Sequence, residues 1–248
     1  MSRGKGPAEA ILAGSPALRA GVVDHGACWI LQTSGVLNIY GELDRDDVQR
    51  IAAHAKVGLI QFARKFAVPA AMLQLLDQHV VAAHPRVRVR ETLNGFGAFD
   101  DLAFLEHLPG LRALGVAGYH AIDLAPIARY VSIEELGIGG LGTSLSPLAG
   151  YPSPVSCYLH ERVEDVETVA TWPRLERLMI RELRIASFEW LVNPTLRELE
   201  LEDVNGVRSY ASLAGLRQLR TLIVRGKLTP AQRAELTPSR FPFEVQVI

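Results

Sequence analysis

Three arginines alternate with valines in the segment RVRVR, at Arg86, Arg88 and Arg90. Successive side chains of a strand point to opposite faces, so the three guanidinium groups are expected on one face. Guanidinium groups bind carboxylates and phosphates through two parallel hydrogen bonds. The neighbouring strand-like segments offer no acidic counterpart on that face. The segment is therefore a candidate site for an anionic partner, and a solvated strand face is the alternative interpretation.

A second charged region pairs arginines with glutamates in two successive strand-like segments, RLMIR and ELELE. Their outward residues are Arg177, Met179, Arg181, Glu198, Glu200 and Glu202. Neighbouring strands lie about 4.8 Å apart, so residues of opposite charge come within reach of each other. Exposed pairs contribute about 0 to 1 kcal/mol each. Recognition of a partner and mutual neutralisation both stay open as roles for these charges.

Aromatic residues stand beside segments that carry almost no outward side chains. Tyr158 and His160 follow two segments whose outward residues are mostly Ala and Gly. This contrast predicts a depression with an aromatic wall, and protein interfaces favour such Tyr anchors. Close packing between neighbouring segments is the alternative. Tyr40, at the end of an early strand-like segment, is a further candidate contact residue.

No pattern in the chain indicates catalysis. The seven histidines show no spacing typical of metal ligands. The Gly-x-Gly sequences between Gly137 and Gly142 lack the Gly-Lys-Ser/Thr of a phosphate-binding loop. Ser156 and His160, four residues apart on one strand, would lie about 13 Å from each other, too far for proton transfer in a triad with Asp165. We therefore expect no catalytic residues, no metal and no cofactor.

A repeated sequence motif places all of these residues on a series of similar strands. In the segment WPRLERLMIR at 172–181, the apolar residues Leu175, Leu178 and Ile180 have the spacing L-x-x-L-x-L, and four other segments repeat it. Pairs of inward apolar residues recur at intervals of 21 to 27 residues. The pairs are Leu37/Ile39, Ile60/Phe62, Val87/Val89, Leu114/Val116, Leu136/Ile138, Cys157/Leu159, Leu178/Ile180, Leu199/Leu201, Leu222/Val224 and Val245/Val247.

This repeat resembles the leucine-rich-repeat family, particularly its short-repeat bacterial class, which includes the internalins. The resemblance implies an α/β solenoid (horseshoe) of about ten rungs, with a concave parallel sheet and a helical or irregular convex side. Two family features are missing, the Asn ladder after the strands and the cysteine-bonded caps. The unit YPSPVSCYLH is also irregular, and Pro152 and Pro154 predict a bent or strained rung there.

The solenoid is expected to form one continuous domain. Residues 1–35 would be an N-terminal segment with a capping hairpin, 36–228 the repeat array and 229–248 a C-terminal capping unit. The hairpin is predicted from the apolar runs 28–32 and 36–40. Helical periodicity predicts helices over 46–55 and 69–83. The Gly- and Pro-rich residues 1–20 are expected to be loosely ordered.

Composition and net charge limit the kinds of binding partner and the cellular compartment that we expect for this chain. A net charge of -1 and a pI near 6.7 disfavour a dedicated nucleic-acid binder. No apolar run approaches the roughly 20 residues of a membrane helix, and Glu9, Pro16 and Arg19 interrupt any signal peptide. The two cysteines, Cys28 and Cys157, are expected to be free thiols. These features predict a cytoplasmic protein.

The expected function is non-enzymatic binding of a partner protein on the concave face. Analogy with the family extends this to an inhibitor or immunity-type role. The alternative is a nucleic-acid or polyanion binder that uses Arg86, Arg88 and Arg90. An enzyme with a site built from loops ranks last.

Overall fold

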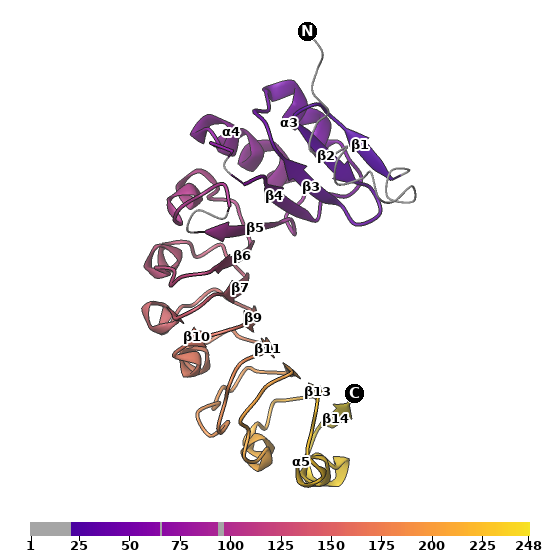
Figure 1. Ribbon diagram of the computed structural model, residues 1–248, viewed down its shortest axis with the longest axis vertical. Coiled ribbons are helices and arrows are strands. Elements are labelled where there is room, and N and C mark those ends of the chain that lie inside the picture. Colours follow the sequence, from indigo (N-terminus) through magenta and orange to yellow (C-terminus); the bar gives the residue numbers. More distant parts are fainter. Residues whose placement is uncertain (1–20, 65, 94–96) are drawn as a thin grey trace. The chain divides into compact units, whose positions relative to one another are not determined.

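The computed structural model describes residues 21–64, 66–93 and 97–248. The chain forms two compact units, Met1–Gly115 and Val116–Ile248. In each unit, short strands follow one another along a sheet and are joined by helices or turns (Figure 1). The predictions made for residues 1–20 lie outside the described residues. No helix in the described part of the chain is long and apolar enough to cross a membrane.

The first unit begins with antiparallel strands and continues with parallel ones. Its elements are β1 (Val22–Asp24), β2 (Cys28–Leu31), β3 (Val36–Ile39), α3 (Arg45–Ala52), β4 (Leu59–Phe62), α4 (Ala70–Leu75), η1 (Leu76–Val81), β5 (Arg88–Leu93) and η2 (Ala103–His107), and β6 (Ala113–Gly118) contains the boundary. β2 and β3 form the predicted hairpin, and β1 pairs with β2 as an additional edge strand. β3, β4 and β5 are parallel.

Both predicted helices are present. Asp44 caps α3 because its carboxylate accepts a hydrogen bond from the backbone N–H of Asp47, while the Asp47 carboxylate accepts one from the N–H of Asp44. α4 starts after Pro69 and passes directly into the π-helix η1. Val48 and Ile51 of α3 are fully buried, so its apolar stripe faces the core of the first unit.

The pairing at β5 differs from the predicted register by two residues. Ile60 lies opposite Val89, which places Phe62 in line with Glu91, and Val87 comes before the strand. The predicted pairing was wrong because the inward row of β5 extends to Glu91, an acid that a hydrophobic pattern does not include. Glu91 is nevertheless 3% exposed, and its Oε1 accepts a hydrogen bond from the backbone N–H of Ala98 at 2.8 Å. Burial raises the pKa of this carboxyl to about 7.

The second unit repeats one motif, in which a strand is followed by a turn and by a connecting segment that leads to the next strand. After β6 its elements are η3 (Ala125–Arg129), β7 (Glu135–Gly139), β8 (Thr143–Ser144), η4 (Ser146–Leu148), β9 (Ser156–His160), β10 (Val163–Glu164), η5 (Val166–Thr171), β11 (Arg177–Arg181), β12 (Glu198–Glu202), η6 (Ala211–Gly215), β13 (Thr221–Arg225), α5 (Pro230–Glu235), η7 (Pro238–Arg240) and β14 (Glu244–Val247). The strands line one side of this unit, and the helical turns line the other (Figure 1).

The inward residues of the second unit stack in register across parallel strands. Leu178 of β11 lies between Cys157 of β9 and Leu199 of β12, and the same register continues to β7, β13 and β14. These three side chains are at most 2% exposed. Burial of one such Leu contributes about 2 kcal/mol. The predicted leucine ladder is therefore confirmed for β7, β9, β11, β12 and β13, whereas β14 keeps the register but leaves Val247 36% exposed.

The rung expected to be bent is regular. All five residues of β9 pair in parallel with β7 on one side and with β11 on the other. Pro152 and Pro154 precede the strand, where the missing proline N–H removes no bond from the ladder. The prediction of a strained rung was wrong because only prolines inside the strand would interrupt the pairing.

In the large sheet, a residue with positive φ follows each strand from β7 to β13. The positions are Gly140, Glu161, Glu182, Asp203 and Gly226, with φ between 50° and 133°. Three of the five are acidic residues, for which this conformation costs about 1 to 2 kcal/mol each. Their backbone N–H groups still donate across the sheet, for example from Glu182 to the carbonyl of Glu202 at 2.9 Å. These N–H groups are thus satisfied by backbone carbonyls of the next strand, without an Asn ladder.

We expect Glu182→Gly to raise the free energy of unfolding by about 1 kcal/mol, because glycine adopts φ of 57° without steric cost. The lost ion pair with Arg181 is exposed and contributes little. Chemical denaturation measures the change. Glu198→Gly, inside β12, is the matched control and should lower stability. Equal destabilisation by both variants would argue against strain at Glu182.

Candidate functional site

The outward residues of β7, β9, β11, β12 and β13, here called the strand face, contain the aromatic pair predicted from sequence. The rings of Tyr158 and His160 stack, with centroids 5.2 Å apart and planes 19° from parallel. His160 leans over Gly139 so closely that a Cβ there would lie 2.0 Å from the ring. The depression predicted at Gly139 is thus filled by imidazole. Burial lowers the pKa of His160, so the ring is neutral at pH 7.

Gly139→Ala is expected to displace the His160 ring from the strand face while changing the free energy of unfolding by less than about 1 kcal/mol, since the contact is with the far end of a half-buried side chain that can rotate away. The imidazole resonances of His160 in an NMR spectrum report the displacement. Gly215→Ala, where an added methyl group meets nothing within 4 Å, should leave them in place. An unshifted His160 in Gly139→Ala would contradict the described contact.

Arg181 links this aromatic pair to the acidic strand. The hydroxyl of Tyr158 lies against the Arg181 guanidinium and, together with Glu202 and Glu182, raises its pKa. The Nε of Arg181 lies 3.0 Å from Glu182 and 3.6 Å from Glu202. A contiguous chain of side chains therefore crosses three strands, from His160 on β9 to Glu202 on β12.

The remaining charges of the strand face are partly neutralised. The Nε of Arg225 donates to Glu200 at 2.7 Å, diagonally across β12 and β13. Arg177 lies opposite Glu198 in the sheet register, as predicted, and both side chains are exposed. Met179 is half-buried and lies between Tyr158 of β9 and Glu200 of β12 in the sheet register. Ion pairs with Arg225 and Arg181 thus neutralise Glu200 and Glu202, and the strand face keeps exposed charges of both signs.

The three arginines of the first unit do not form one strand ladder. Arg86 is in the turn before β5, and Arg88 and Arg90 are on the strand; all three are exposed. The stems of Arg88 and Arg90 run over Gly115, where a Cβ would meet them at 3.7 to 3.9 Å. The predicted alternation of exposed arginines with buried Val87 and Val89 is present, but only Arg88 and Arg90 belong to the strand, because β5 begins at Arg88.

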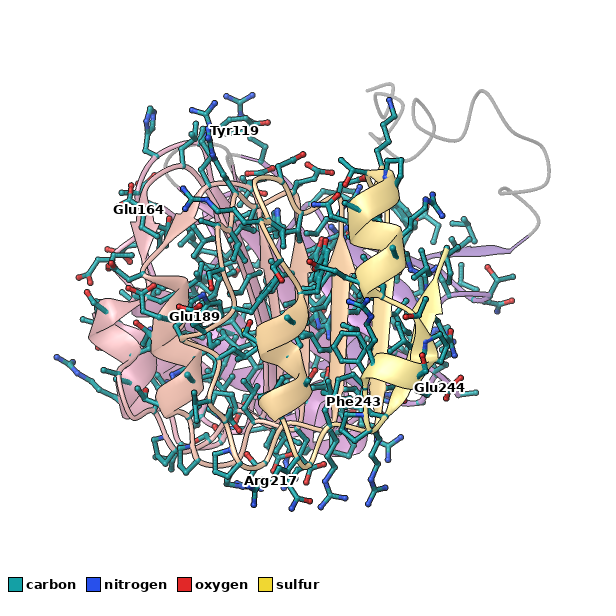
Figure 2. All side chains as sticks on the ribbon, turned by 90° about the horizontal axis from the view of Figure 1, so that it is seen from below. Tyr119, Glu164, Glu189, Arg217, Phe243 and Glu244 are labelled. Carbon is teal, nitrogen blue, oxygen red and sulfur yellow. The ribbon has the colours of Figure 1, made fainter. Side chains whose placement is uncertain are left out.

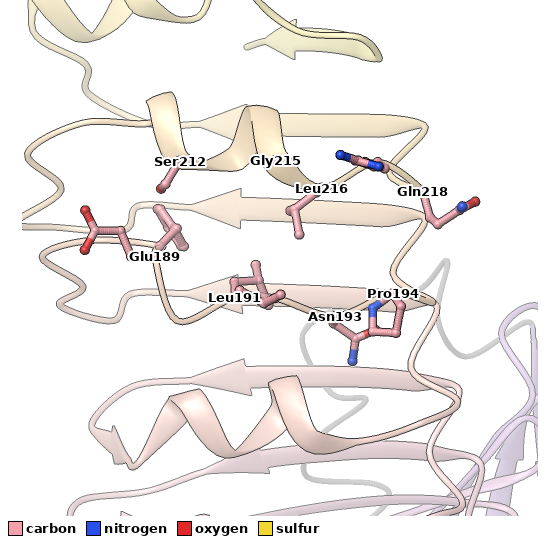
Figure 3. Close-up of a pocket in the computed structure, with 11 residues that line it drawn as sticks. Glu189, Leu191, Asn193, Pro194, Ser212, Gly215, Leu216 and Gln218 are labelled. Carbon is pink, nitrogen blue, oxygen red and sulfur yellow. The ribbon is translucent and has the colours of Figure 1, made fainter.

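A pocket of about 580 Å³ opens between two successive connectors of the second unit, β11 to β12 and β12 to β13 (Figure 3). Apolar side chains form most of its lining, among them Phe188, Leu191 and Leu216. The connector at 187–192 has no 3-10 helix, whereas 211–215 does, and the difference leaves the space. Sequence reasoning missed this site because the absence of a 3-10 helix has no positive signal in the sequence.

Comparison with known proteins supports the fold alone. No protein-family model matches the sequence, and no curated protein matches it. A chain of the Toll–Spatzle complex of Drosophila superposes with a TM-score of 0.51 and 13% identity, over 80% of this chain and 28% of that chain. The fold is a leucine-rich-repeat solenoid. The internalin inlF of Listeria monocytogenes matches with a TM-score of 0.46 and 17% identity, over 96% of this chain and 68% of that chain. Internalin C2 of Listeria monocytogenes matches with a TM-score of 0.37 and 14% identity, over 79% of this chain and 84% of that chain.

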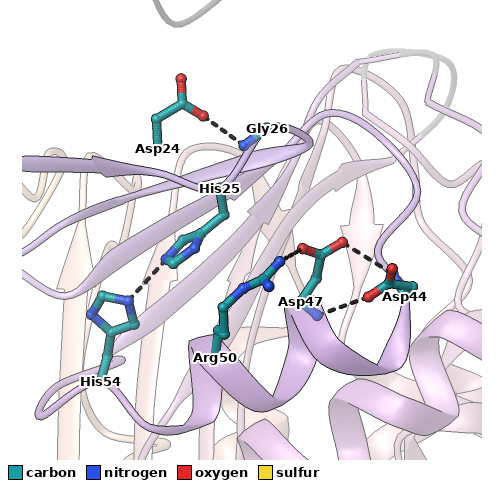
Figure 4. Close-up of polar contacts among 7 residues, drawn as sticks. All are labelled: Asp24, His25, Gly26, Asp44, Asp47, Arg50 and His54. Atoms are coloured by element: carbon teal, nitrogen blue, oxygen red, sulfur yellow. Dashed lines mark hydrogen bonds and ion pairs between the residues drawn. The ribbon is translucent and has the colours of Figure 1, made fainter.

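Polar groups also meet at the N-terminal end of the solenoid (Figure 4). The Nε2 atoms of His25 and His54 are 2.9 Å apart, a hydrogen bond that requires one of the two to be unprotonated. Burial and the neighbouring His54 lower the pKa of His25. Tyr40, named as a contact residue, donates to Asp24 at 3.5 Å. Among the described residues, no three His, Cys, Asp or Glu side chains form a metal site.

The residues considered for catalysis have structural roles in the solenoid. Asp165 accepts a hydrogen bond from Ser144, a contact that joins neighbouring rungs. Gly137 and Gly139 belong to β7, and Gly140 and Gly142 form its turn with positive φ. Cys28 and Cys157 are buried free thiols, and burial raises the pKa of the Cys28 thiol to about 12. A thiol held protonated in this way is a poor nucleophile.

Proposed function

We propose that the chain is a non-enzymatic scaffold that binds a partner protein on the strand face of its second unit. The observation that carries this proposal is the contiguous chain Tyr158, His160, Arg181 and Glu202. Tyr and Arg are the residue types that most often dominate binding energy at protein interfaces. A preformed sheet adds little ordering cost when a partner binds.

The fold provides further support. Repeat proteins expose a sheet that is rigid along its length and wide enough for a protein partner. The structure with a TM-score of 0.51 is itself a protein complex, that of Toll with Spatzle. On fold analogy, the narrower proposal is an inhibitor or immunity-type protein of the internalin-like class. Buried free thiols fit the reducing cytoplasm, which is part of the proposal.

Tyr158→Ala and Arg181→Glu should each weaken capture of the native partner at least about tenfold, because each removes a central contact. The measurement is affinity capture from lysate of the source cell, with quantitation of the protein that copurifies. Glu167→Lys, an exposed charge change on η5, is the control and should capture as well as the wild type. Undiminished capture by both strand-face variants, with unchanged thermal unfolding, would refute the proposal.

Binding of a polyanion is the second candidate, because Arg86, Arg88 and Arg90 are exposed near one another on β5 and its preceding turn. If these residues bind nucleic acid, the binding constant should fall steeply as the salt concentration rises. A plot of its logarithm against the logarithm of salt concentration should have a slope of about -1 per phosphate contact. Fluorescence anisotropy with labelled DNA or RNA tests this. Absence of binding at low salt removes this candidate and leaves the strand-face proposal intact.

A further inference from the structure

The pocket between the two connectors is continuous with exposed apolar surface. Val192, on its rim, is 75% exposed, the largest exposed fraction among the large apolar side chains of the described residues. Phe188, Leu191 and Leu216 form the buried floor, each at most 5% exposed. A protruding branched apolar side chain beside an apolar recess is typical of an interaction surface.

The floor of the pocket is held rigidly by Asn193, which is 4% exposed. Its Nδ2 donates to the carbonyl of Trp172 at 3.0 Å, and its Oδ1 accepts from the backbone N–H of Thr195 and of Leu196. The indole of Trp172 in turn donates to the carbonyl of Leu148 at 2.8 Å. Satisfied buried polar groups of this kind fix one conformation, so the recess is preformed.

Opposite charges lie at the two ends of the recess. Glu189 lies at one end beside Ser212, and Gln218 lies at the other end, directly after Arg217 (Figure 3). Glu189 and Arg217 are also well separated in the view along the sheet (Figure 2). Both side chains are exposed, and neither makes an ion pair with another described residue.

This charge arrangement is self-complementary. Rotation by 180° about an axis through the middle of the recess exchanges its acidic and basic ends. In a two-fold interface, a contact between residue i and residue j occurs twice. Glu189 of one copy would then meet Arg217 of the other, and the reverse pair would form at the opposite end.

We propose that this surface is a homodimer interface, occupied by a second copy of the chain related by a two-fold axis. Val192 inserts into the recess formed by Phe188, Leu191 and Leu216 of the partner copy. Two reciprocal ion pairs between Glu189 and Arg217 fix the orientation. The strand face carries the separate contact with another protein, and the two proposals stand or fall independently.

Sedimentation velocity of the full chain at rising concentration tests the dimer. The wild type should dimerise with a dissociation constant below about 100 µM. Val192→Asp should raise that constant at least about 100-fold, because it places an unpaired charge in the apolar recess. Glu167→Lys, elsewhere on the turn side, should dimerise as the wild type does.

Charge exchange tests the reciprocal pairing. Glu189→Arg and Arg217→Glu should each weaken the dimer about tenfold or more, because like charges then face each other twice. The double variant restores opposite charges and should recover most of the wild-type affinity. A wild type that is monomeric at about 100 µM, a Val192→Asp variant that still dimerises, or a double variant weaker than both single variants would each overturn the proposal.

Discussion

Leu178→Asp is expected to abolish the folded state of the second unit, with a loss of more than about 4 kcal/mol in the free energy of unfolding. Leu178 is 2% exposed and packs between the inward residues of β9 and β12. Truncation of such a Leu alone costs about 2 to 5 kcal/mol. The aspartate adds the cost of an unpaired buried charge, and the loss spreads because each rung is stabilised mainly by its neighbours.

Met179→Asp is the matched control, one residue along the same strand. Met179 points outward and is half-buried, so the carboxylate stays hydrated and the loss should be below about 1 kcal/mol. Circular dichroism during urea denaturation measures both variants. Equal midpoints for Leu178→Asp and Met179→Asp would mean that the inward and outward assignment of β11 is wrong.

The stability of the first unit should depend on the protonation of Glu91. Burial raises the pKa of this carboxyl in the folded state to about 7, against 4.5 as its ordinary value. The folded state therefore holds the proton more tightly than the unfolded state. The contribution of Glu91 is fully present below pH 4.5 and is lost as pH rises to 7. Since each pKa unit corresponds to about 1.4 kcal/mol, the loss is about 3 kcal/mol.

Glu91→Gln isolates this effect from other titrating groups. The amide keeps an oxygen that can accept the hydrogen bond from the Ala98 N–H, and it does not ionise. Denaturation at pH 5 and pH 8 should therefore show the variant gaining about 3 kcal/mol relative to the wild type at the higher pH. A difference between the two proteins that is the same at both pH values would show that Glu91 does not titrate as described.

Local periodicity was sufficient to predict most of the strand ladder. The recurring pairs of apolar residues identified the inward residues of β7, β9, β11, β12 and β13 correctly, because each rung repeats one pattern with few insertions. It failed at β5, where the inward row contains Glu91 and a hydrophobic pattern cannot predict a buried acid. It also overestimated the effect of Pro152 and Pro154, which lie outside the strand they precede.

The candidate sites were less predictable than the fold. Outward positions such as Tyr158 and Arg181 follow from alternation, so the residues of the strand face could be named in advance. The contact of His160 with Gly139 depends on a rotamer that no spacing rule specifies. The recess beside Val192 lies where a connector has no 3-10 helix, and the pair His25 and His54 joins residues 29 positions apart.

Site-specific photocrosslinking tests the central claim, recognition of a protein on the strand face. A photoreactive amino acid placed at Met179 lies in the middle of that face, and one placed at Glu167 lies on the turn side. We expect a covalent adduct with the copurifying partner from position 179 and none from position 167. An adduct formed at position 167 alone would contradict the assignment of the strand face as the binding surface.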